Sequence, residues 1–387
     1  MTDTAASPAD IDLAEVEAAL RSDQAANPRA SGSTPSGTSV QSLNPDVSAV
    51  ANFALAAFSD PDHHQTGGHD PAENGFNLQA LELSLGASVD PHFRFDTQLV
   101  FGEEGVELEE AYATTLDLGA RLQARAGQFL TRFGRLNSTH LHGWNFVDQP
   151  FSLGRVFGAD GNRGLGFELS YLTPLPWYVE LVASATKIGE DATARSFAGE
   201  EGVEVEGPQD LLYVAALKQF FPLSSDWSLA FGVSAALGPN GNQDGARSEV
   251  YGMDAFLKYR PISEPGQTEL TLQTEWLLRR RLLDEQRLTD AGGYGELVLR
   301  FARRYALGAR YEIGTPSYDS HGDVTEDPLD PEWTSARTRV SAQTTFLPSE
   351  FSRLRLQGSR DSGLSKPIWA AFLAAEFAIG AHGAHRF

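Results

Sequence analysis

The chain has 387 residues, no cysteine and a formal net charge of −22 at pH 7. The absence of cysteine excludes disulfides and thiol chemistry, and the negative charge argues against binding to a nucleic-acid backbone. No run reaches the roughly 18 consecutive apolar residues that a transmembrane helix needs, so any segment that crosses a membrane must be a strand.

Residues 1–45 differ in composition from the rest of the chain. Ser-Pro-Ala-Asp at 7–10 is typical of a helix start, and apolar residues then follow at helical spacing, which predicts a short amphipathic helix to about Ser22. The Ser- and Gly-rich run at 30–39 predicts a flexible linker. The helix is either a frayed tail or a small coiled coil between protomers, because an isolated helix of this length is marginal in water.

From Val47 onward, apolar residues recur at every second position in segments spaced by about twenty residues. This alternation is typical of strands, in which successive side chains point to opposite faces. The apolar face of these segments includes Leu81, Leu83, Phe93, Phe95, Leu229, Phe231, Leu270, Leu272, Leu307 and Phe377. Trp and Tyr lie near the segment ends, where an aromatic girdle would meet lipid headgroups.

The opposite faces of the same segments carry charge. Their charged residues include Glu168, Glu180, Asp254, Arg300, Arg310, Arg339, Arg353 and Arg355. Charge on alternate positions is costly inside a soluble core, but it is expected where strands face a water-filled lumen. The alternative is a soluble two-sheet sandwich in which the charged faces meet solvent.

Short and long connections alternate along the chain. The long ones are expected at 59–74, 133–162, 188–209, 238–248, 279–291 and 315–334, with two shorter ones near 104 and 362. The pattern predicts an all-β fold: a closed antiparallel transmembrane β-barrel of about 16 strands over 46–387, with the short helix and linker of 1–45 in the periplasm. Sixteen strands leave room for an aqueous channel.

The last stretch, from Ile368 to Phe387, alternates between a face rich in aromatic residues and a smaller face with one charge. Its terminal Phe387 resembles the assembly signal of bacterial outer-membrane β-barrels. That resemblance implies contact with the barrel assembly machinery and an environment of outer-membrane lipid and lipopolysaccharide. Such a barrel needs an export signal, and none opens the sequence, so we expect Met1 to mark a mature form or a misplaced start.

The stretch 133–162 is too apolar and aromatic to hang in solvent. In a barrel, the inside wall is the available surface, so we expect this loop to fold inward and narrow the pore. Trp144, Phe146 and Phe151 would anchor it there. The polar residues then placed to meet a passing solute are Arg135, His140, His142, Asp148 and Arg155.

Several motifs in and around this loop resemble a known family. They are Gly127-Gln128-Phe129, Phe133-Gly134-Arg135, His140-x-His142-x-Trp144-x-Phe146, Asp148-Gln149-Pro150-Phe151 and Gly161-Asn162-Arg163-Gly164. They are similar to bacterial barrels often labelled zinc-regulated TonB-dependent outer-membrane receptors and, more distantly, to phosphate-selective porins of the O/P type. A TonB-dependent receptor has about 22 strands and a folded plug. With about sixteen strands, the resemblance implies a porin-like channel for small hydrophilic solutes or ions.

Metal ligands are predicted in one outer loop. His63, His64, His69 and Asp70 supply imidazole and carboxylate groups suited to zinc, although a polar exposed loop is the favoured interpretation. No resident cofactor is predicted, and zinc or calcium in the outer loops is left open. The acidic stretches 190–210 and 319–330 suit divalent cations that bridge lipopolysaccharide, and the arginines at 279–281 suit lipid phosphates, but plain solvated surface is the alternative for both.

Passive diffusion through a channel is therefore the predicted function, and no enzymatic activity is expected. The sequence contains no Gly-x-Ser-x-Gly elbow, phosphate loop or His-Glu-x-x-His motif. The alternatives are a zinc uptake receptor and an outer-membrane lipase. Association with further copies of the chain is left open.

Overall fold

The computed structural model describes residues 45–60, 66–103, 105–189, 192–198, 203–241, 245–263, 266–283, 286–363 and 365–380. The predicted N-terminal helix and linker, His63, His64 and Phe387 lie outside these ranges.

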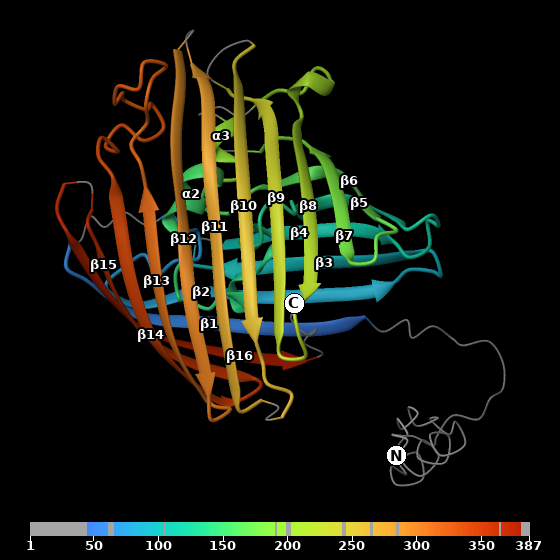
Figure 1. Cartoon of the computed structure of the whole chain (residues 1–387), viewed down its shortest axis with the longest axis vertical. Coiled ribbons are helices and arrows are strands. Elements are labelled where there is room, and N and C mark those ends of the chain that lie inside the picture. Colours follow the sequence, from blue (N-terminus) through green and yellow to red (C-terminus); the bar gives the residue numbers. More distant parts are fainter. Residues whose placement is uncertain are drawn as a thin grey trace, which may run out of the picture. The chain divides into compact units, whose positions relative to one another are not determined.

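The described residues from Asp46 onward form sixteen strands that close into one barrel (Figure 1). The strands are β1 (Asp46–Phe58), β2 (Gly75–Ser88), β3 (Phe93–Gly102), β4 (Gly105–Thr115), β5 (Leu122–Leu130), β6 (Arg163–Leu172), β7 (Tyr178–Thr186), β8 (Leu212–Pro222), β9 (Trp227–Pro239), β10 (Arg247–Tyr259), β11 (Thr268–Leu283), β12 (Gln286–Phe301), β13 (Tyr305–Gly314), β14 (Arg337–Ser349), β15 (Ser352–Asp361) and β16 (Ile368–Gly380). Each strand pairs antiparallel with its sequence neighbours, and β1 pairs with β16 to close the sheet. The predicted closed antiparallel barrel of sixteen strands is confirmed.

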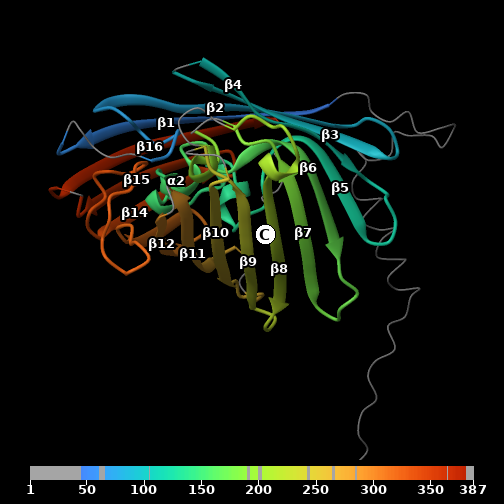
Figure 2. The ribbon, with the colours of Figure 1, turned by 90° about the horizontal axis from the view of Figure 1, so that it is seen from above.

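Helical turns occur in the long connections. These are η1 (Leu136–Ser138), η2 (Leu141–Gly143) and α2 (Phe151–Phe157) between β5 and β6, and α3 (Arg195–Ala198) and η3 (Pro208–Asp210) between β7 and β8. Viewed from above, α2 lies inside the ring of strands, where it contacts β12 and β13 (Figure 2). Within the described ranges, no helix has the length and apolar character needed to cross a membrane.

The alternation of the strands separates an apolar outside from a polar inside. Leu272, Leu307 and Phe377 are exposed on the outer face, as expected for side chains that meet lipid. Leu229, Phe231 and Leu270 share that face and are half-buried. A closed barrel with this outer face is a bacterial outer-membrane protein.

Packed side chains occupy part of the inside of the barrel. A continuous apolar cluster joins the connection after β5, the connection after β7 and the inward faces of β8–β12. Its members include Phe133, Leu136, Leu153, Phe157, Phe197, Val214, Val250 and Leu277. In a second, smaller cluster, Val147 packs against inward residues of β1 and β16.

The predicted outer loop at 279–291 is wrong. β11 and β12 both run through it and are joined by a connection of minimal length after Leu283. Arg279 and Arg281 point inward and are buried, whereas Arg280 lies on the outer face near Tyr251. The interpretation of all three arginines as lipid-phosphate contacts is therefore wrong for two of them, because the alternation of the strand turns them toward acidic partners inside the barrel.

A β-bulge in β4 changes which residues face inward. The register with β3 shifts between the pairs Gln98–Glu110 and Leu99–Leu108. A bulge places two consecutive residues opposite one, so Glu109 and Glu110 both turn toward the lumen and are buried. The bulge therefore places two adjacent carboxylates, those of Glu109 and Glu110, at one point of the inner wall.

Candidate functional site

The candidate functional site is the connection between β5 and β6, residues 131–162, here called the inner loop, together with the walls that it contacts. Its first turn needs glycine, because Gly134 has φ +57° and its Cα faces the Glu275 carboxylate. The Gly134 amide donates to Ser234 of β9 over 3.1 Å, and the amides of Arg135 and Leu136 donate to Glu275 of β11 over 3.1 and 2.7 Å. These bonds fix the first residues of the inner loop to β9 and β11 inside the barrel.

Asp148 holds the middle of the inner loop to β13 and β14. Its carboxylate accepts from Arg310 Nη2 over 2.6 Å and lies 3.2 Å from Arg339 Nη1. It also accepts from Gln357 Nε2 of β15 over 2.7 Å. Burial opposes the charged form, but the two guanidinium groups hold the pKa of Asp148 below its ordinary value. Asp148 is therefore a buried anion with matched partners rather than a group open to solute.

Backbone carbonyls of the inner loop accept from the remaining inward arginines. Arg353 donates to the carbonyls of His142 and Trp144 over 2.9 and 2.8 Å, and Arg355 donates to that of Phe146 over 2.9 Å. Arg310 and Arg339 donate likewise to the carbonyls of Asp148 and Gln149 over 2.8 and 2.7 Å. The predicted lumen-lining arginines of β13–β15 thus face inward and donate to the inner loop, although Arg353 Nε and Arg355 Nε and Nη2 have no hydrogen-bond partner among the described residues.

On the opposite wall, histidines of the loop meet carboxylates of β2 and β4. His140 lies between Glu109 and Glu110, with ring nitrogens 2.9 and 3.1 Å from their oxygens. His142 bonds Glu82 through Nδ1. The two imidazole rings stack with centroids 5.8 Å apart. Burial lowers the pKa of His140, but Glu109 and Glu110 outweigh it and raise that pKa well above its ordinary value.

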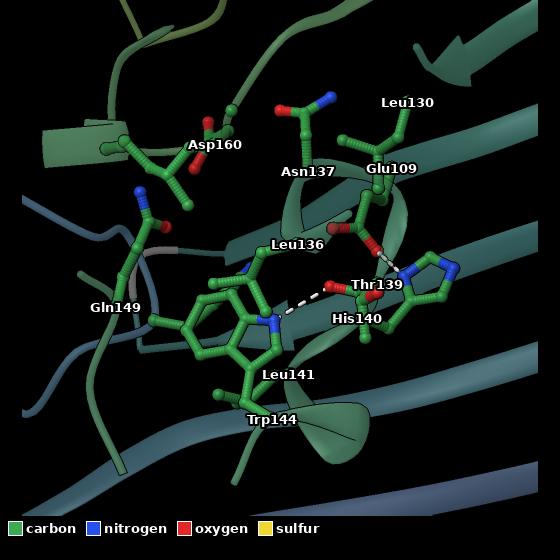
Figure 3. A pocket seen from close by; sticks show the side chains of 14 residues that line it. Glu109, Leu130, Leu136, Asn137, Thr139, His140, Leu141, Trp144, Gln149 and Asp160 are labelled. Carbon is green, nitrogen blue, oxygen red and sulfur yellow. Dashed lines mark hydrogen bonds and ion pairs between the residues drawn. The ribbon is translucent and has the colours of Figure 1, made fainter. Parts of the chain in front are cut away.

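A small cavity lies beside this histidine pair (Figure 3). Its volume is about 40 Å³, and it is partly open. The polar groups around it include His69, Glu109, Asn137, His140, Gln149 and Asp160. Figure 3 shows the Trp144 indole donating to the Thr139 carbonyl on one side and His140 against Glu109 on the other.

A charged cluster joins three of the long connections. Asp330, from the connection after β13, lies within 3.3 Å of nitrogens of Arg155, Arg195 and Arg279. Asp327 from the same connection pairs with Arg279 and Arg281. These aspartates belong to the acidic stretch interpreted as surface, and they are instead buried or nearly so. Arg155, predicted to meet solute, is buried in this cluster.

The other predicted residues are distributed along the lumen. Arg135 is half-buried: it stacks on Phe256 at 3.8 Å and donates to Gln273 over 3.0 Å. Glu168 and Glu180 are bridged by Arg132, and Asp254 lies 3.5 Å from Lys218. Arg300 has the inward parity of β12, but it lies exposed at the end of the strand and donates to the Arg303 carbonyl.

The predicted metal ligands are divided. His63 and His64 fall outside the described residues, and His69 lines the cavity. Asp70 accepts from the amides of Gly67 and Gln149 over 3.2 and 2.7 Å. Burial and the neighbouring Asp148 raise the pKa of Asp70 to about 7. In the described part of the chain, no group of three His, Cys, Asp or Glu residues is arranged to hold a metal ion.

Sequence analysis missed Glu82, Glu109 and Glu110. A signal was present, because Glu107, Glu109 and Glu110 break the alternation of their strand. Two adjacent carboxylates in an otherwise alternating segment are what a bulge with both residues turned inward produces.

The raised pKa of His140 gives a prediction of pH dependence. The stabilisation that His140 gives to the inner loop is fully present below the ordinary value of 6.5 and is lost as the pH rises through the raised folded-state pKa. Local opening around 139–143 should therefore increase at high pH, because the neutral ring no longer pairs with the two carboxylates. Hydrogen exchange, corrected for its intrinsic pH dependence, measures this opening.

The matched variants for this measurement are His140→Gln and His92→Gln. His140→Gln should remove the pH dependence, whereas His92→Gln changes an exposed histidine in the turn between β2 and β3 and should preserve it. Equal pH dependence in both variants would show that His140 does not clamp the loop.

The fold of this barrel is similar to that of solved outer-membrane proteins, two of which are named as a channel and a porin. DcaP, an outer membrane channel of Acinetobacter baumannii, aligns with a TM-score of 0.56 and 12% identity over 87% of this chain and 98% of that one. An anion-selective porin from Comamonas acidovorans aligns with a TM-score of 0.54 and 11% identity over 87% and 99% of the two chains. At these identities the likeness shows the fold alone.

These findings overturn the resemblance drawn from the motifs. The similar structures are porins and channels rather than TonB-dependent receptors, and the barrel has sixteen strands instead of about 22. No family model matches the sequence, so the more distant likeness to phosphate-selective porins is also unsupported.

One relative is similar in sequence as well. A protein of Aquifex aeolicus (strain VF5), described as uncharacterized, is 31% identical over 387 aligned positions, which cover 89% of this chain and 80% of that protein. The chain therefore belongs to the same family as this Aquifex aeolicus protein.

Proposed function

We propose that the chain is a porin-like channel for passive diffusion of small hydrophilic solutes or ions, narrowed by the inner loop. The observation that carries the proposal is the position of this loop, whose contacts run from Glu82 of β2 through Glu275 of β11 to Arg353 of β15. A loop bonded to walls on several sides leaves only a restricted passage, which is how a wide barrel becomes a selective one.

The polar inner surface supports the same proposal. Inward positions on either side of the loop carry paired charges such as Arg94 with Asp96 and Lys258 with Glu269, and these remain partly exposed. Such a surface suits water and dissolved solutes rather than an apolar cargo. DcaP and the Comamonas porin are named as channels, and we extend that role to this chain as part of the proposal.

Planar-bilayer recording of the refolded full chain tests this proposal. Discrete conductance steps in KCl are the expected result. A parallel assay for phospholipid hydrolysis addresses the lipase alternative, for which the proposal expects no product. A chain that is folded by circular dichroism, inserts into the bilayer and conducts no ions would overturn the channel proposal.

A further inference from the structure

Charges inside the barrel divide into two opposed groups. The basic wall consists of Arg310, Arg339, Arg353 and Arg355 on β13–β15. The acidic wall consists of Glu82, Glu107, Glu109 and Glu110 on β2 and β4. The charge preference of the channel depends on whether a passing ion meets the basic wall or the acidic wall.

The inner loop covers both walls, since the side chains of Glu82, Glu109 and Glu110 are only 3%, 10% and 10% exposed. The walls differ in how far their charges are matched. The side chains of Arg310, Arg339 and Arg355 are at most 5% exposed, and that of Arg353 is 15% exposed. Asp148 and Glu312 neutralise the first two, and Glu376 lies against Arg353 and 3.8 Å from Arg355. Arg353 Nε and Arg355 Nε and Nη2 are buried without a hydrogen-bond partner among the described residues. Three carboxylates nevertheless face the four arginines, so the positive surplus of the basic wall is small.

The acidic wall keeps a negative surplus. Among the described groups of the acidic wall, Arg163 pairs with Glu107. The imidazole ring of His140 lies between Glu109 and Glu110 and contacts both carboxylates. Asp160 adds a further carboxylate beside the cavity. Four glutamates and one aspartate thus face one arginine and three histidines, because His69 also lies beside the cavity, and the wall keeps a negative surplus with His140 protonated.

One carboxylate oxygen on this wall has no donor. Glu82 Oε2 accepts from Gln98 over 3.1 Å and bonds His142, but Glu82 Oε1 is buried and has no hydrogen-bond partner among the described residues. A buried carboxylate oxygen without a partner is costly, and a cation beside it relieves that cost. The side chain of Glu82 is only 3% exposed, so its charge acts inside the cluster rather than in bulk solvent.

The cavity beside His140 is lined by the carboxylates of Glu109 and Asp160, but not by Glu82 or Glu110, and its size suits a small ion. A water molecule needs roughly 10–15 Å³ of such space, and the cavity of about 40 Å³ therefore accommodates a partly dehydrated ion with a water molecule or two. Since no described group of three ligands is arranged for a metal, these carboxylates suit transient passage rather than tight binding.

We infer that the conducting path runs between the inner loop and the acidic wall and prefers small cations over anions, with Glu82, Glu109 and Glu110 as the residues that set this preference. The inference rests on the proposed channel function. The net charge of −22 acts in the same direction, because a negative protein raises the local concentration of cations at its entrance.

The test is the reversal potential of the full chain in a planar bilayer under a KCl gradient. The wild type should give a potential of the sign for K⁺ preference. Glu82→Gln and Glu110→Gln should each lower the K⁺ to Cl⁻ permeability ratio several-fold. The matched control, Glu249→Gln, removes the same charge from the outward face of β10 near Tyr251 and should leave the ratio unchanged.

Arg353→Gln is the fourth variant, and it tests the contribution of the basic wall. If the basic wall sets selectivity instead, this variant shifts the reversal potential toward K⁺ more than the two Glu variants shift it away. That result, or a wild type that prefers Cl⁻ or neither ion, would overturn the inference while leaving the channel proposal intact. Absence of any conductance would instead remove the channel proposal on which the inference rests.

Discussion

Deleting residues 138–152 is expected to raise single-channel conductance several-fold and to shift the ion preference from cations toward anions. The deletion removes the stretch from His140 to Ser152, which bonds both walls, and so opens the middle of the lumen. It also removes Asp148 and the loop carbonyls from the basic wall. The four arginines then face water, and their charge acts on passing ions.

The measurement is conductance and reversal potential in the same bilayer. A variant in which 138–152 is replaced by Gly and Ser at equal length is the control, since it keeps the chain length but none of the side-chain contacts. It should lie between the wild type and the deletion in conductance. Unchanged conductance in the deletion would show that the loop lies outside the conducting path.

Asp148→Asn is expected to undock the inner loop, at a cost of about 3–5 kcal/mol. The substitution keeps the shape of the side chain but removes the charge that pairs with Arg310 and Arg339. Both arginines are buried, and removing one partner of a buried ion pair leaves an uncompensated charge, which is the origin of this cost. Glu312 remains as their single carboxylate.

Proteolysis of the loop in detergent micelles and urea unfolding measure this effect. Asp117→Asn is the matched control, because Asp117 is exposed in the turn between β4 and β5 and its loss should change stability by less than about 0.5 kcal/mol. Equal protease resistance in the two variants would mean that Asp148 does not hold the loop.

The barrel was predictable because its signal is local. An alternating strand fixes both faces at once, so the outward Leu272 and the inward Glu168 follow from the sequence alone. The same reasoning found the stretch 133–162, whose aromatic residues are too apolar for solvent. These conclusions required no knowledge of which strand lies opposite which.

The roles of individual charges were not predictable, because they depend on partners far along the chain. From the sequence, Arg310 and Arg355 are expected to line the lumen. Only the structure shows that they donate to backbone carbonyls of the inner loop. Arg279 was interpreted as a surface residue because its partners are distant in the sequence. Asp290 lies on another strand and Asp327 in another loop. The bulge at Glu109 and Glu110 was visible as a break in alternation, but its meaning depended on the position of His140.

The contacts of the inner loop also set an order for assembly. The Val147 amide donates to Gln357, 210 positions later in the chain, and the carbonyls of His142 and Trp144 accept from Arg353. None of these bonds exists until β15 has joined the sheet, and closing contacts of such long sequence separation is slow. The inner loop therefore cannot complete its contacts with the wall before β15, one of the last two strands of the chain, has paired.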